Sequence, residues 1–145
     1  MSTELILQRL RLFLLALSGA LCVGTIVELS LIGHWEDLPQ FLPFILCTLG
    51  LGVVVAMLLR PQARTIRVLR WIMGITFAGS LFGVFEHIEH NFSFALEIQP
   101  NATVGQIFFD ALGGANPLLA PGMLAVAAML AMAATYYHPS METPS

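Results

Sequence analysis

Apolar residues gather into four long stretches of the sequence, at about residues 12–32, 41–59, 71–90 and 118–137. Polar residues or prolines separate these stretches from one another. A helix needs about 20 apolar residues to cross the hydrocarbon core of a bilayer, and each stretch comes close to that length. The pattern therefore predicts an all-α fold, in which residues 1–145 form one membrane domain of four transmembrane helices in an antiparallel bundle.

Prolines and charged residues set the expected ends of these helices. Arg60-Pro61 ends the second stretch, because a proline ring blocks a continuing helix and lacks an N–H donor. The third stretch has fifteen uncharged residues from Trp71 before Glu86, so a full crossing must carry Glu86 on its last turn. The fourth helix is expected to begin at Asn116-Pro117 or at Ala120-Pro121, since proline suits a first helical turn.

The segment 91–115, between the third and fourth stretches, is long enough to hold structure of its own. Within it, residues 101–112 predict a short outer helix that Gly113-Gly114 ends. The apolar residues of this helix recur at three- and four-residue spacing and form one stripe: Val104, Ile107, Phe108 and Ala111. Two interpretations stay open. The helix lies on the bilayer surface or caps the bundle, or its stripe docks another subunit.

The composition excludes a soluble globular protein. Hydrophobic residues make up 57% of the chain and charged residues 10%, whereas an ordinary soluble domain carries about 25% charged residues. The formal net charge is −3, and all six basic residues are arginines. The chain thus has no extended basic surface for nucleic acid, and the lipid bilayer is its expected surrounding.

The arginines all lie on one side of the predicted membrane. Arg9 and Arg11 precede the first stretch, and four more connect the second stretch to the third: Arg60, Arg64, Arg67 and Arg70. Because short cytoplasmic loops carry the excess of basic residues, both termini are expected in the cytoplasm. The spacings of four, three and three in the second group predict one side of a short helix that sets topology and contacts lipid headgroups. A patch that docks a partner is the alternative.

Glu28 and Glu86 are ionisable residues at predicted membrane depth, where such groups are costly and point to function. The first and third helices end on the same side, so these carboxyls are expected at similar heights. Together with His34, His87 and His90, they offer carboxylate and imidazole ligands for one divalent metal. The alternatives are a hydrogen-bonded polar cluster where the helix leaves the bilayer, and a pathway for protons or small ions.

No catalytic residues are predicted. Cys22 and Cys47 lie inside apolar stretches with no histidine nearby in sequence, so they are interpreted as small core residues. The fourth stretch is rich in alanine, which lets membrane helices approach closely within a bundle or across a subunit interface.

Four segments are distinctive as a set: Val27–Pro43, Asn91–Glu97, Asn116–Gly122 and Tyr136–Pro139. Together they resemble an uncharacterised family of small bacterial four-helix integral membrane proteins. The resemblance implies a multi-pass protein of the bacterial inner membrane. It implies no activity, cofactor or site.

Two functions are compatible with these features. The first, which we take as the leading hypothesis, is a non-enzymatic accessory or interaction subunit that assembles with a membrane-protein partner or with copies of itself. The alternative is a metal-binding or proton-relay membrane protein that uses the Glu/His cluster on the outer face.

Overall fold

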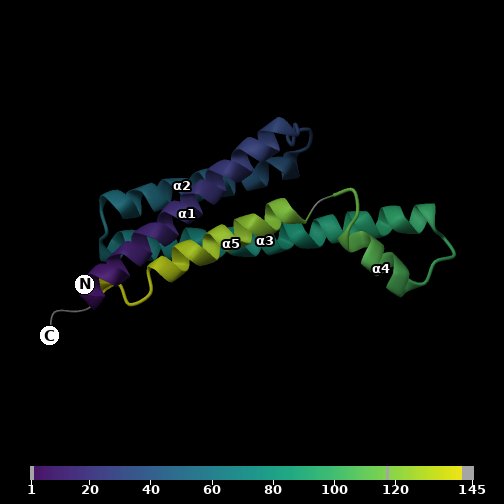
Figure 1. Ribbon diagram of the computed structural model, residues 1–145. Coiled ribbons are helices and arrows are strands. Elements are labelled where there is room, and N and C mark those ends of the chain that lie inside the picture. The colour runs from purple at the N-terminus through teal and green to yellow at the C-terminus, as the bar shows by residue number, and fades with distance from the viewer. Residues whose placement is uncertain (1, 117, 142–145) are drawn as a thin grey trace.

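The computed structural model describes residues 2–116 and 118–141, and every regular element within them is a helix (Figure 1). In chain order these elements are α1 (Thr3–Leu31), the 3-10 helix η1 (Leu38–Phe41), α2 (Leu42–Leu59), α3 (Ala63–Ile98), α4 (Val104–Leu112), α5 (Leu119–Ala134) and the 3-10 helix η2 (Pro139–Met141). The predicted all-α class is confirmed. Pro117, at one of the two expected starts of the fourth helix, lies outside the described residues.

Three helical segments are long and apolar enough to cross a membrane. They are α1 with 29 residues, the segment Leu38–Leu59 with 22, and α3 with 36. α5 is also apolar but has 16 residues, which corresponds to about 24 Å at the usual helical rise. The lengths and compositions of these helices support a helical membrane protein.

α3 differs most from the stretch that predicted it. It begins at Ala63 and continues to Ile98, beyond both ends of the expected 71–90. The polar residues that follow Glu86 disfavour hydrocarbon, but they can still form a helix. No proline interrupts the chain before Pro100, so the helix can continue. The apolar pattern thus marked the lipid-facing part of a longer helix.

The expected short arginine helix is the first part of α3. Arg64, Arg67 and Arg70 lie on α3, whereas Arg60 is the C-terminal cap residue of α2. The prediction that Arg60 shares their helix is wrong, because Pro61 interrupts the helix between them.

α4 folds back against the far part of α3 (Figure 1). Thr103 caps its first turn by accepting a hydrogen bond from the backbone N–H of Gln106. Of the predicted apolar stripe, Ile107 and Ala111 are fully buried, while Val104 remains 73% exposed. The stripe is therefore divided between a buried face and an open one.

α5 is the central packing partner of the two longest helices, α1 and α3. Its buried face consists of small side chains, and Ala127, Ala128 and Ala131 have no exposed surface. The buried Ser18 of α1 donates a hydrogen bond of 2.8 Å to the backbone carbonyl of Ala127. Small residues thus bring the backbones of α1 and α5 close together, as the alanine-rich sequence suggests.

The core lies between the helices, and most large apolar side chains on their outer faces are exposed. Phe13, Trp71 and Phe85 are each more than 60% exposed. Cys22 and Cys47 are fully buried as free thiols and pack together between α1 and α2. An apolar outer surface around a small interior is the arrangement that a lipid solvent favours.

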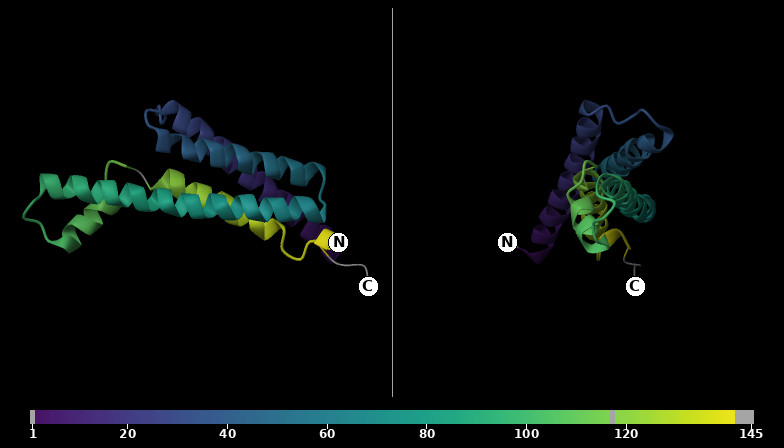
Figure 2. Two further views of the ribbon diagram at one scale, coloured as in Figure 1. Left: turned by 180° about the vertical axis from the view of Figure 1, so that it is seen from behind. Right: turned by 90° about the vertical axis from the view of Figure 1, so that its right-hand side faces the viewer.

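The ends of the molecule differ in chemistry. Figure 2 shows the start of α1, the α2–α3 connection and η2 gathered at one end, with η1 and α4 away from it. All six arginines of the chain lie near the first end, in the start of α1, the C-terminal cap of α2 and the first turns of α3. We call this the arginine end, and the opposite end of the α1–α2 pair the η1 end.

Candidate functional site: a histidine-lined cavity at the η1 end

A cavity of about 750 Å³ opens between α1, η1, α2, α3 and α5 at the η1 end. Most of its wall is apolar and includes Leu29, Leu46, Phe82 and Leu124. Its polar wall contains three imidazole groups and two carboxyl groups, from His34, His87, His90, Asp37 and Glu86. This combination of apolar wall and a few polar groups is typical of small-molecule sites.

The end of α1 positions His34. Gly33 adopts a left-handed conformation with φ of +68°, which a residue with a side chain rarely adopts. The backbone N–H of His34 then donates to the carbonyl of Leu29 at 2.9 Å, and that of Gly33 to Ser30 at 3.3 Å. This Schellman arrangement stops the helix and turns the chain back, so that His34 lies against the cavity.

η1 forms the next part of the wall. The side-chain oxygen of Gln40 accepts hydrogen bonds from the backbone N–H groups of Glu36 at 2.7 Å and Asp37 at 3.4 Å. Pro39 fixes the backbone within the same turn. These contacts hold Asp37, the N-cap residue of η1, at the cavity.

One side of α3 supplies the largest share of polar groups. Ser80, Glu86, His87 and His90 all line the cavity from this helix. Ser80 donates a hydrogen bond to the backbone carbonyl of Pro121, which fastens the start of α5 to α3. The cavity is thus closed on one side by a direct α3–α5 contact.

Asn91 fixes the connection that leads from α4 into α5. It is 3% exposed. Its side-chain nitrogen donates to the carbonyls of Ala111 and Asn116, and its side-chain oxygen accepts from the backbone N–H of Asn116, all at 2.9 Å. Because Asn116 lines the cavity, this buried amide determines the position of the wall near α5.

The structure brings together four of the five residues predicted as metal ligands. His34, Glu86, His87 and His90 line the cavity, but Glu28 is exposed and does not. On α1 the cavity side carries Thr25 and Leu29 instead. The expected meeting of Glu28 with the Glu86 turn is therefore absent from the cavity, because Glu28 lies on a different face of its helix.

The geometry does not assemble these donors around a single metal. Within the described ranges, no group of three or more His, Cys, Asp and Glu side chains is arranged to hold an ion. His90 directs its Nδ1 at the backbone carbonyl of Glu86 at 3.1 Å and lies 3.6 Å from a carboxylate oxygen of Glu89. One of its two ring nitrogens is thus engaged by its own helix.

His34 lies outside the helices, in the connection between α1 and η1. Burial lowers the pKa of His34 below its usual value, and the positive charge of a protonated His87 lowers it further. His34 therefore favours the neutral imidazole, with one nitrogen able to donate a hydrogen bond and the other to accept one.

Sequence reasoning missed Asp37 and Thr25 as cavity residues. Asp37 stands two residues before Pro39, a pattern that indicates the start of a helix and not a binding site. Thr25 is a small polar residue within an apolar stretch, and nothing in the sequence distinguishes it from a core residue. In the structure it lines the cavity one helical turn before Leu29. The four-residue spacing places Thr25 and Leu29 on the same side of the helix. The sequence does not show that this side faces the cavity.

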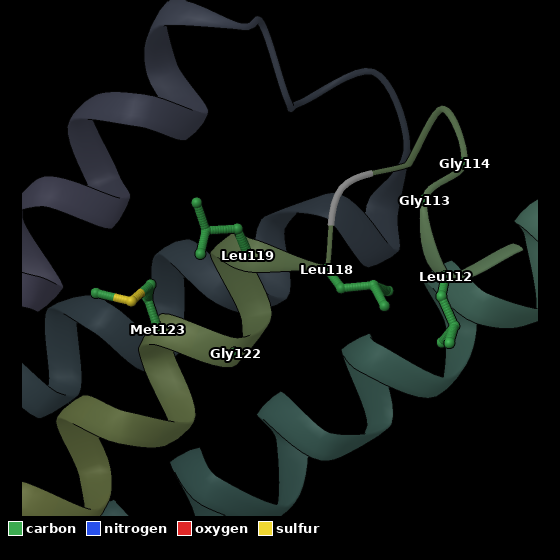
Figure 3. Close-up of a pocket in the computed structure, with 7 residues that line it drawn as sticks. All are labelled: Leu112, Gly113, Gly114, Leu118, Leu119, Gly122 and Met123. Atoms are coloured by element: carbon green, nitrogen blue, oxygen red, sulfur yellow. The ribbon is translucent and has the colours of Figure 1, made fainter. Parts of the chain in front are cut away.

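A second depression, of about 530 Å³, lies where α4 leads into α5 (Figure 3). Apolar side chains such as Leu112, Leu118 and Met123 line it together with three glycines. It has no titratable lining residue, so the cavity at the η1 end remains the candidate site.

No known family model, curated protein or solved structure matches the chain.

Proposed function

We propose that the chain spans the bacterial inner membrane four times as an antiparallel bundle, with α5 as its short fourth span and both termini in the cytoplasm. The arginine end would then face the cytoplasm, as the excess of basic residues there favours. The η1 end and α4 would face outward. The similarity to small bacterial four-helix membrane proteins is part of the same proposal.

This topology is tested by labelling with a membrane-impermeant maleimide in intact cells. Ser2→Cys lies just before α1 and is expected to react only after the membrane is broken. Thr103→Cys lies before α4 and is expected to react in intact cells. Cys22 and Cys47 are fully buried and give little background. Labelling of both introduced cysteines from the same side would contradict the proposal.

We further propose that the protein acts by binding rather than by catalysis, and that it binds a small amphipathic molecule in the cavity at the η1 end. The supporting observation is the wall itself: imidazole and carboxyl groups stand beside a mostly apolar surface. A molecule with an apolar body and one polar group would satisfy both parts, and it could enter from the adjoining lipid.

Native mass spectrometry of the protein in mild detergent tests this function. We expect a retained small molecule on the wild-type chain. Ala120→Phe fills the cavity, since Ala120 is 8% exposed and lines the wall, and is expected to lose that molecule. Ala133→Phe adds the same side chain at an exposed position of α5 and serves as the control. Equal retention by both variants would refute the proposal.

A second candidate function is the accessory or interaction subunit. Beyond the cavity, α4 and the end of α3 expose large apolar side chains: Val104 and Phe109 are each 73% exposed, and Ile98 is 62% exposed. An apolar patch of this kind suits a membrane-protein partner or a second copy of the chain. Copurification of one stoichiometric partner, lost on Phe109→Ser, would favour this function.

A further inference from the structure

We infer that the cavity at the η1 end selects positively charged amphipathic molecules, a class of lipophilic organic cations. This inference rests on the proposed binding function and names the charge of its ligand. It follows from the distribution of charge around the cavity, from the aromatic and aliphatic wall, and from the size of the space.

The charged groups of the wall are acidic. Asp37 brings a carboxyl group from the η1 side and Glu86 brings another from α3. None of the residues that line the cavity is Arg or Lys, because every arginine belongs to the arginine end. These two carboxyl groups therefore face no arginine or lysine side chain within the wall. Such a wall attracts a cation and repels a phosphate or a carboxylate.

The apolar part of the wall favours an organic cation. Leu29, Leu46 and Leu124 are almost fully buried at the wall, so the body of such a ligand would contact apolar side chains instead of water. Phe82 adds an aromatic ring to the same wall, and ring faces attract organic cations. A strongly hydrated inorganic cation would gain nothing from these apolar contacts.

Thr25 supplies an independent polar contact deeper in the cavity. It lines the wall and is only 4% exposed. Its hydroxyl group adds a side chain that can donate or accept a hydrogen bond to the wall.

The size of the space fits an organic molecule. A volume of about 750 Å³ lies within the range of roughly 300 to 1,000 Å³ that drug-sized ligands occupy. The described residues do not gather three metal ligands, which also favours an organic cation over a bare metal ion.

Three probes of similar shape and different charge test the inference. Tetraphenylphosphonium is cationic, triphenylphosphine oxide is neutral and tetraphenylborate is anionic. Their equilibrium binding to the purified full chain in a neutral detergent is measured at a pH of about 8, well above the pKa of an ordinary imidazole. We expect saturable binding in the order cation, neutral molecule, anion.

The carboxyl groups are then neutralised one at a time. Asp37→Asn and Glu86→Gln are each expected to weaken tetraphenylphosphonium binding about tenfold and to leave the neutral probe unchanged. Glu89→Gln is the matched control, because Glu89 lies three residues from Glu86 on α3, is exposed and does not line the cavity. Asp37 is itself exposed, so its amide variant tests the charge with little effect on folding.

The outcomes separate the inference from the function on which it rests. Equal binding of the cation and the neutral probe, or wild-type affinity for the cation in both carboxyl variants, would overturn the charge preference and leave the binding function standing. Failure of all three probes to bind saturably would overturn both.

Discussion

Arg70 of α3 binds Thr135, the residue that ends α5, through two hydrogen bonds. Its Nε donates to the hydroxyl oxygen of Thr135 and its Nη2 to the backbone carbonyl of the same residue, both at 2.9 Å. Arg11 of α1 donates to the carbonyl of Tyr137 at 2.7 Å. Cations are favourable at the C-terminus of a helix, where unpaired carbonyls carry partial negative charge. The arginine end thus closes α5 with side chains from two other helices.

Arg70→Ala is expected to destabilise the protein by about 1.5 to 3 kcal/mol, because charged hydrogen bonds to a buried residue are lost. Thr135 has no exposed surface, so water cannot readily replace the arginine. The measurement is the free energy of unfolding in mixed micelles of mild detergent and dodecyl sulfate.

Arg67→Ala is the control for this change. Arg67 is exposed, and its Nε donates to the carbonyl of Ala63 in its own helix at 3.4 Å. We expect little loss of stability in this variant, since an exposed local contact contributes little. Equal losses in the two variants would show that Arg70 acts only as a surface charge.

Much of this fold is readable from the sequence, because the strongest signals are local. The apolar stretches locate both ends of α2 and the C-terminal end of α1 to within one residue, and Arg60-Pro61 marks the break before α3. The start of α1 was not located, because the helix begins at Thr3 and its first turns contain charged residues. Gly113 follows α4 as expected. The far end of α3 was not predictable in this way, because hydropathy reports contact with lipid and not the end of a helix.

The candidate site was predictable in part. The C-terminal ends of the first and third helices were expected on the same side of the membrane. His34, Glu86 and His87 do line one cavity at the η1 end. The rotation of α1 about its axis was not predictable, since an apolar stretch with no polar face gives no direction. For this reason Glu28 was placed among the ligands, while Thr25 was not.

Gly114→Ala is expected to destabilise the α4–α5 connection. An ideal Cβ at Gly114 would lie 2.5 Å from the side-chain Cγ of Asn91, and Asn91 is held by three hydrogen bonds and cannot move freely. We expect a loss of about 1 to 3 kcal/mol, which is typical of overpacking. Gly113→Ala is the control, since nothing lies within 4 Å of its Cβ. A comparable loss in both variants would contradict the contact with Asn91.

Ala131→Leu is expected to disturb the packing of α5 against its neighbours. Ala131 has no exposed surface and belongs to the core cluster with Leu15 and Met73. Adding three carbon atoms there requires the helices to separate, at a cost of about 1 to 3 kcal/mol. Ala133→Leu makes the same change at an exposed position and is expected to be neutral. Thermal unfolding monitored by circular dichroism compares the two, and matching midpoints would refute close packing at Ala131.

His138 is expected to make the stability of the arginine end depend on pH. It follows α5, and its Nδ1 accepts a hydrogen bond from the backbone N–H of Ser140 at 3.2 Å. Ser140 in turn donates from its hydroxyl group to the carbonyl of Pro61 at 2.6 Å. Burial lowers the pKa of His138, and the charge of Arg11 lowers it further. Protonation of Nδ1 would remove its hydrogen bond with Ser140, the residue whose hydroxyl group joins η2 to the α2–α3 connection.

Since the folded chain holds the proton of His138 less tightly than the unfolded chain does, the unfolded state gains protons first as the pH falls. The contribution of His138 to stability is therefore complete above its ordinary pKa of about 6.5 and decreases below it. We expect the unfolding midpoint to fall between about pH 7.5 and pH 5, and to fall less in His138→Gln. His90→Gln, at an exposed ring far from η2, is expected to keep the wild-type dependence. An unchanged slope in His138→Gln would show that this histidine does not couple the C-terminal segment to pH.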